Sequence, residues 1–363
     1  MIRFLRSAKR SELEGVALLR LDFNTTDEWR LAATVPTVEF LAKRAQAVVI
    51  VSHRGRPDGK RDATLSLRKD AALLEKYIKR RVTFIPHFHW LAIREKLRIA
   101  PRHSVFLLEN IRFLRGESTR KPELARTLSS LADFYVNDAF AVAHHPSDSV
   151  AGMKRFLPSY AGLELEKEIK FLSDVCKKPK KPLVLVLGGA KAHDKLGVIE
   201  QFRRKATAIL VGGGSANTLL YLKGIPVGSS AVDKKDLAKL KKVLKYPNVI
   251  LPVDWRGEGG RILDIGPRTA KEFARHIAGA RTIIWSGPMG LIEKKKFAEG
   301  NFVVARAIAR NKGAFSLTGG GETVMFLKKH KLDRNFSFIS TGGGAFLEFL
   351  AGEKLPGIEA LRR

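Results

Sequence analysis

Leu183-Val-Leu-Val-Leu-Gly-Gly189 is an apolar run that stops at a glycine pair, and the pattern recurs four more times in the second half of the chain. The other four runs begin at Ala208, Ile283, Phe315 and Phe338, and each leads into a glycine cluster. Buried parallel strands read as continuous apolar runs, and open α/β sheets bind ligands just beyond the carboxyl ends of their strands. Because glycine lets backbone N–H groups approach an anion closely, the five clusters predict a nucleotide-sized anion site.

The length and composition indicate a globular protein with two domains. The chain has 363 residues, too many for one ordinary core, and 45% of them are hydrophobic. No stretch approaches the roughly 18–20 apolar residues of a membrane span, and the first ten residues lack the apolar core of a signal peptide. Cys176 is the only cysteine, which excludes an intrachain disulfide. We therefore expect a cytoplasmic protein with no membrane partner.

The formal net charge of +30 indicates polyanionic ligands, either phosphorylated metabolites in a cleft or nucleic acid on a surface. Most lysine clusters, such as those in 177–181 and 234–245, are typical of solvated polar faces. The sequence contains no zinc finger, RNP aromatic pair or basic zipper. We therefore expect nucleic-acid binding only as a weak, non-specific and salt-sensitive side effect.

The first half also alternates strand-like and helix-like segments. Expected strands cover 16–23, 47–52, 82–85, 105–108 and 134–136, and expected helices cover 37–44, 68–79, 91–97 and 122–131. Strands separated by helices predict βαβ units and a parallel sheet with right-handed crossovers. We expect an α/β protein with two doubly wound, Rossmann-like parallel-sheet domains, 1–160 and 178–345, joined by a hinge helix within 161–177.

The strand ends of the first half carry arginine, histidine and amide side chains instead of glycine clusters. These side chains lie in Arg20–Asn24, Ser52–Arg56, Glu109–Arg112 and Asn137–His145. Arginine forks match the oxygens of phosphate and carboxylate, which lysine meets only as a point charge. The first half therefore predicts a site for a small, highly anionic ligand. Together the two halves predict phosphoryl transfer between a nucleotide and a small phosphorylated acid.

The chain lacks Gly-x4-Gly-Lys-Ser/Thr and Gly-x-Gly-x-x-Gly, so it is no P-loop enzyme, and a dinucleotide dehydrogenase or protein-kinase glycine loop is disfavoured. Eight other motifs follow in order: Arg20–Asn24, Ser52–Gly59, Leu107–Phe113, Val136–Phe140, Gly188–Lys195, Trp285–Gly290, Gly319–Thr323 and Ser340–Gly344. In this order the motifs resemble phosphoglycerate kinase over nearly the whole chain. The resemblance implies a glycolytic and gluconeogenic enzyme that uses Mg²⁺ to transfer the γ-phosphoryl of ATP reversibly to 3-phosphoglycerate. It also implies domain closure around the substrates, and we expect a monomer.

The resemblance also implies roles for individual residues. Those expected to hold the phosphoglycerate are Asp22, Asn24, Arg30, His53, Arg54, Gly55, Arg56, Arg112, His144 and His145. Those expected at the nucleotide are Gly189, Ala190, Lys195, Gly213, Gly214, Ser286, Pro288, Glu293, Gly319, Gly320, Gly321, Glu322 and Thr323, with Glu322 meeting the metal directly or through water. Catalytic roles fall to Arg30, Lys191, Lys195, Gly320 and Gly343. The tail 346–363 is expected to return to the N-terminal domain.

Four features depart from the family's pattern. His145 stands where arginine is usual, Glu322 where aspartate is usual and Ser286 where asparagine is usual. The chain is also shorter than usual, with a trimmed loop after Asn24 and a compact stretch 254–266. Unless His145 is protonated or another arginine, such as Arg54 or Arg115, substitutes, we expect weaker phosphoglycerate binding with a pH dependence between roughly pH 6 and 7.5. The chemistry stays feasible, because the acceptor carboxylate is ionised at neutral pH and needs no general base. A degenerate relative that binds nucleotide or nucleic acid through its basic surface is the alternative.

Overall fold

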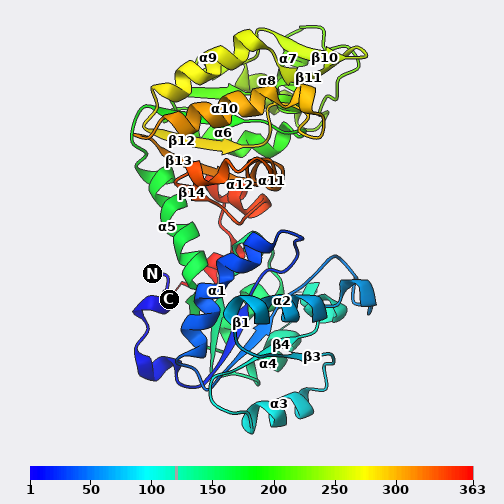
Figure 1. Cartoon of the computed structure of the whole chain (residues 1–363), viewed down its shortest axis with the longest axis vertical. Helices are drawn as coiled ribbons and strands as arrows, with labels where there is room; N and C mark the ends of the chain where they lie inside the picture. The colour runs from blue at the N-terminus through cyan, green and yellow to red at the C-terminus, as the bar shows by residue number, and fades with distance from the viewer. Residues whose placement is uncertain (119–121, 363) are drawn as a thin grey trace. The chain divides into compact units, whose positions relative to one another are not determined.

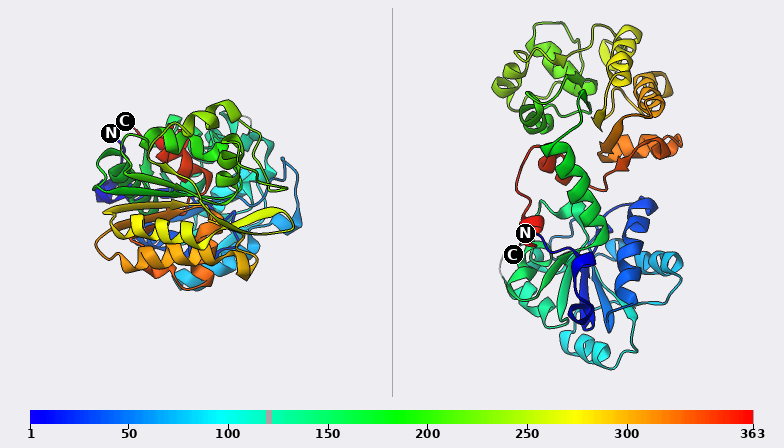
Figure 2. Two further views of the ribbon diagram at one scale, coloured as in Figure 1. Left: turned by 90° about the horizontal axis from the view of Figure 1, so that it is seen from above. Right: turned by 90° about the vertical axis from the view of Figure 1, so that its left-hand side faces the viewer.

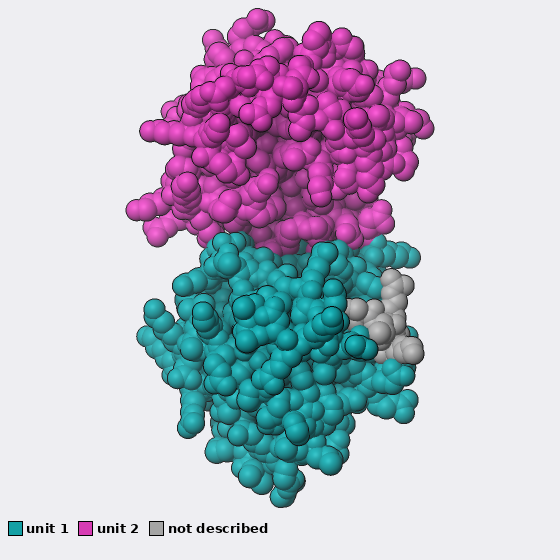
Figure 3. Space-filling view, turned by 90° about the vertical axis from the view of Figure 1, so that its right-hand side faces the viewer, with its two compact units in different colours: residues 1–170, 354–363 teal, residues 171–353 magenta. Residues whose placement is uncertain are grey.

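The computed structural model describes residues 1–118 and 122–362, which form two compact units (Figures 1 and 3). Unit 1 comprises Met1–Lys170 and Lys354–Arg363, and unit 2 comprises Phe171–Glu353. Each unit is built on a six-stranded parallel sheet, which confirms the predicted fold class. The helix α5 (Leu163–Lys177) contains the division between the units. Of the C-terminal tail, only the last ten residues, from Lys354, belong to unit 1.

The sheet of unit 1 has the strand order β3-β4-β2-β1-β5-β6. Its strands are β1 (Val16–Arg20), β2 (Ala47–Val51), β3 (Val82–Ile85), β4 (Ser104–Leu108), β5 (Phe134–Asn137) and β6 (Ser159–Ala161). Its helices are α1 (Glu28–Ala42), α2 (Arg68–Ile78), α3 (Trp90–Arg98), α4 (Glu123–Ser129) and α13 (Pro356–Glu359). All five residues of β2 are buried, as expected for a central parallel strand with helices on both faces.

Two elements of unit 1 differ from the sequence prediction. The helix α1 begins at Glu28, well before residue 37, and it contains Pro36. Proline removes a backbone donor and usually ends a helix, so the sequence favours a later start. The strand β6 has three residues, which is too few for a periodic signal, and it forms by pairing with β5.

The sheet of unit 2 has the strand order β14-β13-β12-β7-β8-β9. Its strands are β7 (Leu183–Leu187), β8 (Ala208–Val211), β9 (Val249–Ile250), β12 (Thr282–Ser286), β13 (Phe315–Gly319) and β14 (Phe338–Ile339). Its helices are α6 (Leu196–Phe202), α7 (Gly213–Leu222), α8 (Leu237–Val243), α9 (Pro267–Ala278), α10 (Glu299–Arg310), α11 (Gly321–Lys329) and α12 (Gly344–Leu350). Figure 2 shows helices on both faces of this sheet, and the five apolar runs of the sequence are five of its strands.

An antiparallel hairpin interrupts this parallel architecture. It consists of β10 (Trp255–Glu258) and β11 (Arg261–Ile265), joined by Gly259 and Gly260. These glycines have φ of 58° and 71°, which suits a two-residue hairpin turn and is unfavourable for other residues. The sequence predicted only that 254–266 is compact, because β10 is exposed along its whole length and has no apolar pattern.

The apolar residues of each sheet form the core of that unit. Trp285 on β12 and Phe273 on α9 are fully buried in unit 2, as are Phe23 and Leu19 in unit 1. Among the described residues, no helix is long and apolar enough to cross a membrane.

Candidate functional site

Asp22 is the centre of a polar cluster that follows β1 and β2 of unit 1. One of its oxygens accepts a hydrogen bond from Nη2 of Arg30 at 2.6 Å, and the other lies 3.6 Å from Nδ1 of His53. The side-chain oxygen of Asn24 accepts from the backbone N–H of Gly55 at 2.8 Å. The loops after β1 and β2 are therefore tied together, with Arg30 and His53 on either side of one carboxylate.

A cationic hollow continues this cluster. It is lined by Arg56, Asp58, Gly59, Arg112, Leu114, Arg115 and His145. Nη1 of Arg112 donates to the backbone oxygen of Gly55 at 2.7 Å, and burial followed by the charge of Arg20 lowers the pKa of Arg112. Cations held this close to one another favour the binding of a multiply charged anion.

The two histidines of the sequence motif pack ring against ring, with His144 and His145 centroids 3.9 Å apart. Burial, then His144 and the arginines Arg112 and Arg56, lowers the pKa of His145 to about 4. The free protein therefore holds His145 neutral at pH 7. The pH window expected from the sequence concerns substrate binding, so it stays a prediction that requires the bound anion to raise this pKa.

Arg54 points elsewhere in this structure. Its guanidinium donates to both oxygens of Asp70, at 2.6 and 3.3 Å, and to the backbone oxygen of Thr25 at 3.1 Å. Arg56 and Arg112, but not Arg54, line the cationic hollow.

Sequence reasoning assigned no role to Arg20, which lies beneath the cluster and is 1% exposed. Its Nε donates to Oγ of Ser149 at 2.9 Å, its Nη2 lies 3.1 Å from Nδ1 of His53, and Glu117 is 3.9 Å away. Burial, followed by the charge of Arg20, holds the pKa of His53 well below its ordinary value. Arg20 stands two residues before Asp22 in the same motif, and that proximity was the available signal.

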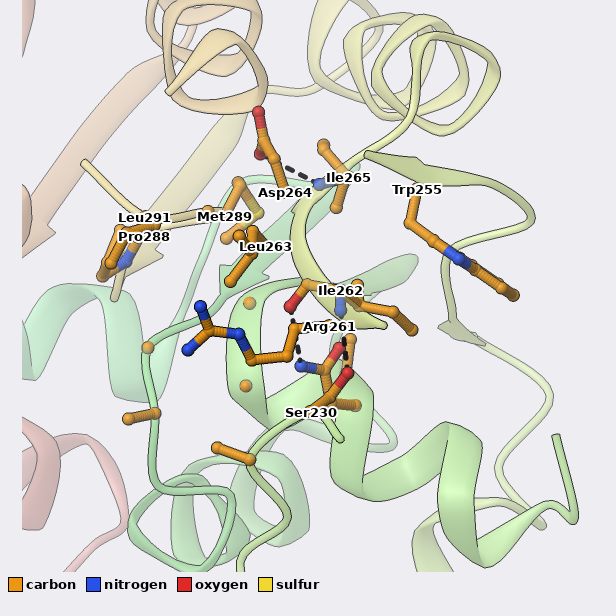
Figure 4. A pocket seen from close by; sticks show the side chains of 18 of the residues that line it. Ser230, Trp255, Arg261, Ile262, Leu263, Asp264, Ile265, Pro288, Met289 and Leu291 are labelled. Carbon is orange, nitrogen blue, oxygen red and sulfur yellow. Dashed lines mark hydrogen bonds between the residues drawn. The ribbon is translucent and has the colours of Figure 1, made fainter. Parts of the chain in front are cut away.

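Unit 2 contains a pocket along the glycine loops (Figure 4). Seven residues predicted for the nucleotide line it: Gly189, Ala190, Gly213, Gly214, Pro288, Glu293 and Glu322. The sequence did not predict the other lining residues, which include Asn217, Ser230, Pro252, Met289, Leu291 and five consecutive residues of β11, Arg261–Ile265. Apart from Met289, which lies in the motif Trp285–Gly290, these residues come from segments outside the eight motifs, so the motifs could not identify them.

The glycines after β7, β8 and β12 allow loops to pack against one another. The N–H of Gly189 donates to the backbone oxygen of Pro288 at 2.8 Å, and that of Gly213 donates to the oxygen of Met289 at 3.0 Å. A Cβ at Gly188 would lie 2.1 Å from the oxygen of Pro288. The sequence interpretation needs correction here, because these two N–H groups already have protein partners and are not free for an anion.

The glycines before α11 and α12 are different, because they face open space. Apart from the chain neighbours and the helix's own backbone, no atom of the described residues lies within 4 Å of a Cβ built at Gly321 or Gly343, and the nearest to one at Gly320 is Oγ of Ser286, at 3.5 Å. Gly319, in contrast, packs on the ring of Phe346, 2.8 Å from its built Cβ. The free N–H groups of a helix N-terminus and its dipole both favour an anion in that space.

Three further predicted residues lie around these loops. Lys195 is 8% exposed, and burial lowers its pKa. The charges of Asp194 and Glu322 act in the other direction and raise this pKa, but by less. Oγ1 of Thr323 accepts from the N–H of Gly287 at 2.9 Å, which joins the start of α11 to the loop after β12. Lys191 is exposed next to the pocket residue Ala190.

Comparison with known proteins shows the family. Residues 14–353 match the family model described as phosphoglycerate kinase. The chain belongs to the phosphoglycerate kinase family. The phosphoglycerate kinase of Thermosipho africanus is 41% identical and the alignment covers 95% of this chain and 94% of that protein. That of Rubrobacter xylanophilus is 39% identical over 98% of each chain. The solved phosphoglycerate kinase from Coxiella burnetii is 33% identical, covers 99% of both chains and gives a TM-score of 0.86.

The family determines the reaction, and the predicted enzyme class is confirmed. A phosphoglycerate kinase transfers the γ-phosphoryl of ATP reversibly to the carboxylate of 3-phosphoglycerate, giving 1,3-bisphosphoglycerate and ADP in glycolysis and gluconeogenesis. The family uses Mg²⁺ with ATP. The roles of individual residues in this chain stay predictions.

Proposed function

We propose that the pocket of unit 2 binds MgATP or MgADP and that the cationic cluster of unit 1 binds 3-phosphoglycerate. The observation that carries this assignment is the gathering of seven predicted residues around one pocket whose lining is mostly apolar. A purine needs such a pocket, and a charged phosphoglycerate needs the arginines and histidines of the other unit.

Within the nucleotide site, Gly189, Ala190, Gly213, Gly214 and Pro288 flank the adenosine, and Glu293 accepts the ribose hydroxyls. The phosphates lie at the start of α11, beside Gly320, Gly321 and Thr323, and Lys195 contacts them. The open space at Gly321 supports this placement, since no described side chain lies within 4 Å of a Cβ built there. Gly319 and Ser286 lie next to Gly320 and help to hold this phosphate-binding loop in place.

The Mg²⁺ ion fits Glu322 as an additional oxygen ligand. Glu322 lines the nucleotide pocket, and no described group of three or more histidine, cysteine or acidic side chains forms a ready metal cage. Mg²⁺ typically uses one or two carboxylates together with substrate phosphates, directly or through water. When bound, the ion neutralises charge on the nucleotide phosphates.

The phosphoglycerate is held by Asp22, Asn24, His53, Gly55, Arg56, Arg112, His144 and His145. Arg54 joins this set only if it leaves Asp70. During transfer, Arg30, Lys191 and Lys195, with the N–H groups beside Gly320 and Gly343, stabilise charge on the equatorial oxygens. No side chain has to remove a proton from the attacking carboxylate. The domain closure implied by the resemblance stays a prediction.

Calorimetric titration of two variants tests the assignment of substrates to units. We expect Arg56→Met to weaken 3-phosphoglycerate binding roughly tenfold, because one charge-assisted contact is lost, and to leave MgADP binding unchanged. Glu293→Gln is expected to weaken MgADP binding roughly tenfold and to leave 3-phosphoglycerate binding unchanged. If either variant weakens the other ligand instead, the assignment is wrong.

Replacing the unusual histidine tests the phosphoglycerate site separately. We expect His145→Arg to lower the KM for 3-phosphoglycerate roughly tenfold, because a permanent charge replaces an imidazole that is neutral in the free protein. A bound phosphate raises the pKa of His145 from about 4, so binding takes up a proton and weakens as pH rises between the two values. The variant should therefore show a flatter KM profile over pH.

The matched control is His89→Arg, which adds the same charge at an exposed position outside the cluster. The substrate phosphate titrates identically in the assays of the native protein, His145→Arg and His89→Arg. Only a difference between their profiles of KM against pH therefore reports on position 145. Equal KM values for the native protein and His145→Arg would contradict a role for this position.

The remaining expectations belong to the same proposal. The +30 charge supports weak, salt-sensitive binding of nucleic acid without sequence preference. A monomer located in the cytoplasm is the simplest form in which this enzyme would act.

A further inference from the structure

The hairpin of unit 2 brings an arginine into the nucleotide pocket. Arg261 is the first residue of β11, directly after the Gly259–Gly260 turn, and it lines the pocket. Figure 4 shows its guanidinium pointing into the pocket, toward the side where Leu263 and Met289 lie. The rest of that lining is mostly apolar, and Arg261 is itself exposed, so its guanidinium stays hydrated until a ligand arrives.

No carboxylate neutralises this guanidinium. Among the described residues, none lies within salt-bridge distance of Arg261. Its cross-strand partner Glu258 instead faces Lys296 at 2.6 Å and Lys294 at 3.6 Å. Asp264, also in the lining, points away from Arg261, as Figure 4 shows. Arg261 therefore keeps its donors available for a ligand.

Several other polar groups of the lining already have protein partners. The carboxylate of Asp264 accepts from the N–H groups of Ile265 and Gly300, each at 2.9 Å. Nδ2 of Asn217 donates to the oxygen of Ile262 at 3.4 Å.

Ser230 and Trp255 are no better placed to recognise a base. Oγ of Ser230 accepts from the N–H of Ile262 at 2.8 Å and also donates to the oxygen of Val227. The indole of Trp255 points away from the pocket (Figure 4). The carboxylates Glu293 and Glu322 are assigned to ribose and metal, so among the lining residues Arg261 is the charged donor left to meet the base.

The chemistry of a guanidinium selects between purine bases. It carries five N–H donors in a planar fork and no acceptor. Guanine offers two acceptors on one edge, O6 and N7, whereas adenine offers N7 beside an amino group that is itself a donor. A donor-only fork therefore matches a 6-oxopurine on both atoms and adenine on one. The apolar faces of the pocket accept either base.

We propose that Arg261 is a specificity-determining residue that contacts O6 and N7 of a 6-oxopurine and so raises the use of GTP and ITP relative to ATP. The inference rests on the proposed nucleotide site. The inference predicts the ratio of kcat/KM values for different nucleotides. The proposed site predicts only that a purine nucleotide binds there.

The test is kcat/KM for ATP, GTP and ITP in the native protein and in Arg261→Met and Arg261→Lys. We expect Arg261→Met to lower the GTP/ATP ratio roughly tenfold, the discrimination of one bidentate pair, and to lower the ITP/ATP ratio equally. ITP has O6 and N7 but no 2-amino group, so parallel losses for GTP and ITP identify the edge that is read. Arg261→Lys should retain part of the preference, because a lysine is a single point donor.

Arg256→Met is the matched control, since Arg256 is an exposed arginine of the same hairpin and does not line the pocket. It should leave all ratios unchanged. Equal losses for ATP, GTP and ITP in Arg261→Met would show stacking on the base face and overturn the proposal, as would ratios that do not change. If Arg261→Met and Glu293→Gln both leave every nucleotide parameter unchanged, the proposed nucleotide site itself is wrong.

Discussion

We expect Arg30→Met to lower kcat roughly 10²–10³-fold, the usual cost of removing one donor aimed at charge that develops in the transition state. Arg30 is well placed for this role, because its side chain is held on Asp22 at 2.6 Å and is still 19% exposed. Its Nε is buried and has no hydrogen-bond partner among the described residues. A guanidinium that is anchored by one nitrogen is oriented before the substrate arrives, and preorganised donors need little rearrangement during the reaction.

The split between kcat and KM distinguishes catalysis from binding. Loss of a contact made only in the transition state lowers kcat and kcat/KM equally. Loss of a contact that serves only substrate binding raises KM and leaves kcat unchanged. Arg30→Lys should recover only part of the rate, because a lysine cannot hold Asp22 and reach a phosphoryl oxygen together. Arg98→Met, an exposed arginine paired with Glu95, is the control for general charge loss. A kcat within threefold of the native value would contradict the role of Arg30.

The second large effect concerns Lys195, where activity and stability should change in opposite directions. We expect Lys195→Met to lower kcat/KM for MgATP roughly 10²-fold, because a charge-assisted contact to phosphate is lost in a buried site. The same substitution should raise the thermal midpoint of the ligand-free protein by about 2–4 °C. Lys195 is 8% exposed, and removing a buried cation relieves its desolvation cost.

The pH dependence of this stability follows from the direction of the pKa shift. Burial lowers the pKa of Lys195 in the folded state, so the unfolded chain holds the proton more tightly. The destabilisation is complete below the folded-state pKa and disappears as pH rises toward the unfolded-state value. The gain from Lys195→Met should therefore be largest at neutral pH and smaller in alkaline buffer.

Calorimetric melting with and without MgADP measures both effects. The native protein should gain stability on adding MgADP, and Lys195→Met should gain much less. Lys170→Met, which changes an exposed lysine of α5, is the control. A variant that is less stable than the native protein without ligand would show that Lys195 has a structural partner in the fold.

Several features of this protein follow from the sequence alone, because they depend on local patterns. The apolar run Leu183–Leu187 is long enough to be a buried strand, and the glycine pair after it marks the carboxyl end where ligands bind. Eight ordered motifs predicted the phosphoglycerate kinase family, and the comparisons confirmed it. Motifs such as Arg20–Asn24 also predicted which strand ends carry polar side chains.

What each side chain contacts depends on the tertiary structure. Arg54 and Arg56 are two residues apart in one loop, but Arg54 binds Asp70 whereas Arg56 lines the cationic hollow. The glycines after β7 and β8 serve loop packing, which is visible only when Pro288 and Met289 lie against them. These contacts join segments far apart in the chain, and local propensity carries no information about them.

The sequence by itself determined the two parallel sheets, the family and the strand ends that carry the chemistry, because these are encoded in runs and motifs of a few residues. Only the tertiary structure decided that Arg261 enters the nucleotide pocket, that Lys195 is buried, and that Arg20 lies beneath His53. Burial and charge pairing depend on what surrounds a side chain, and those surroundings exist only once the chain has folded.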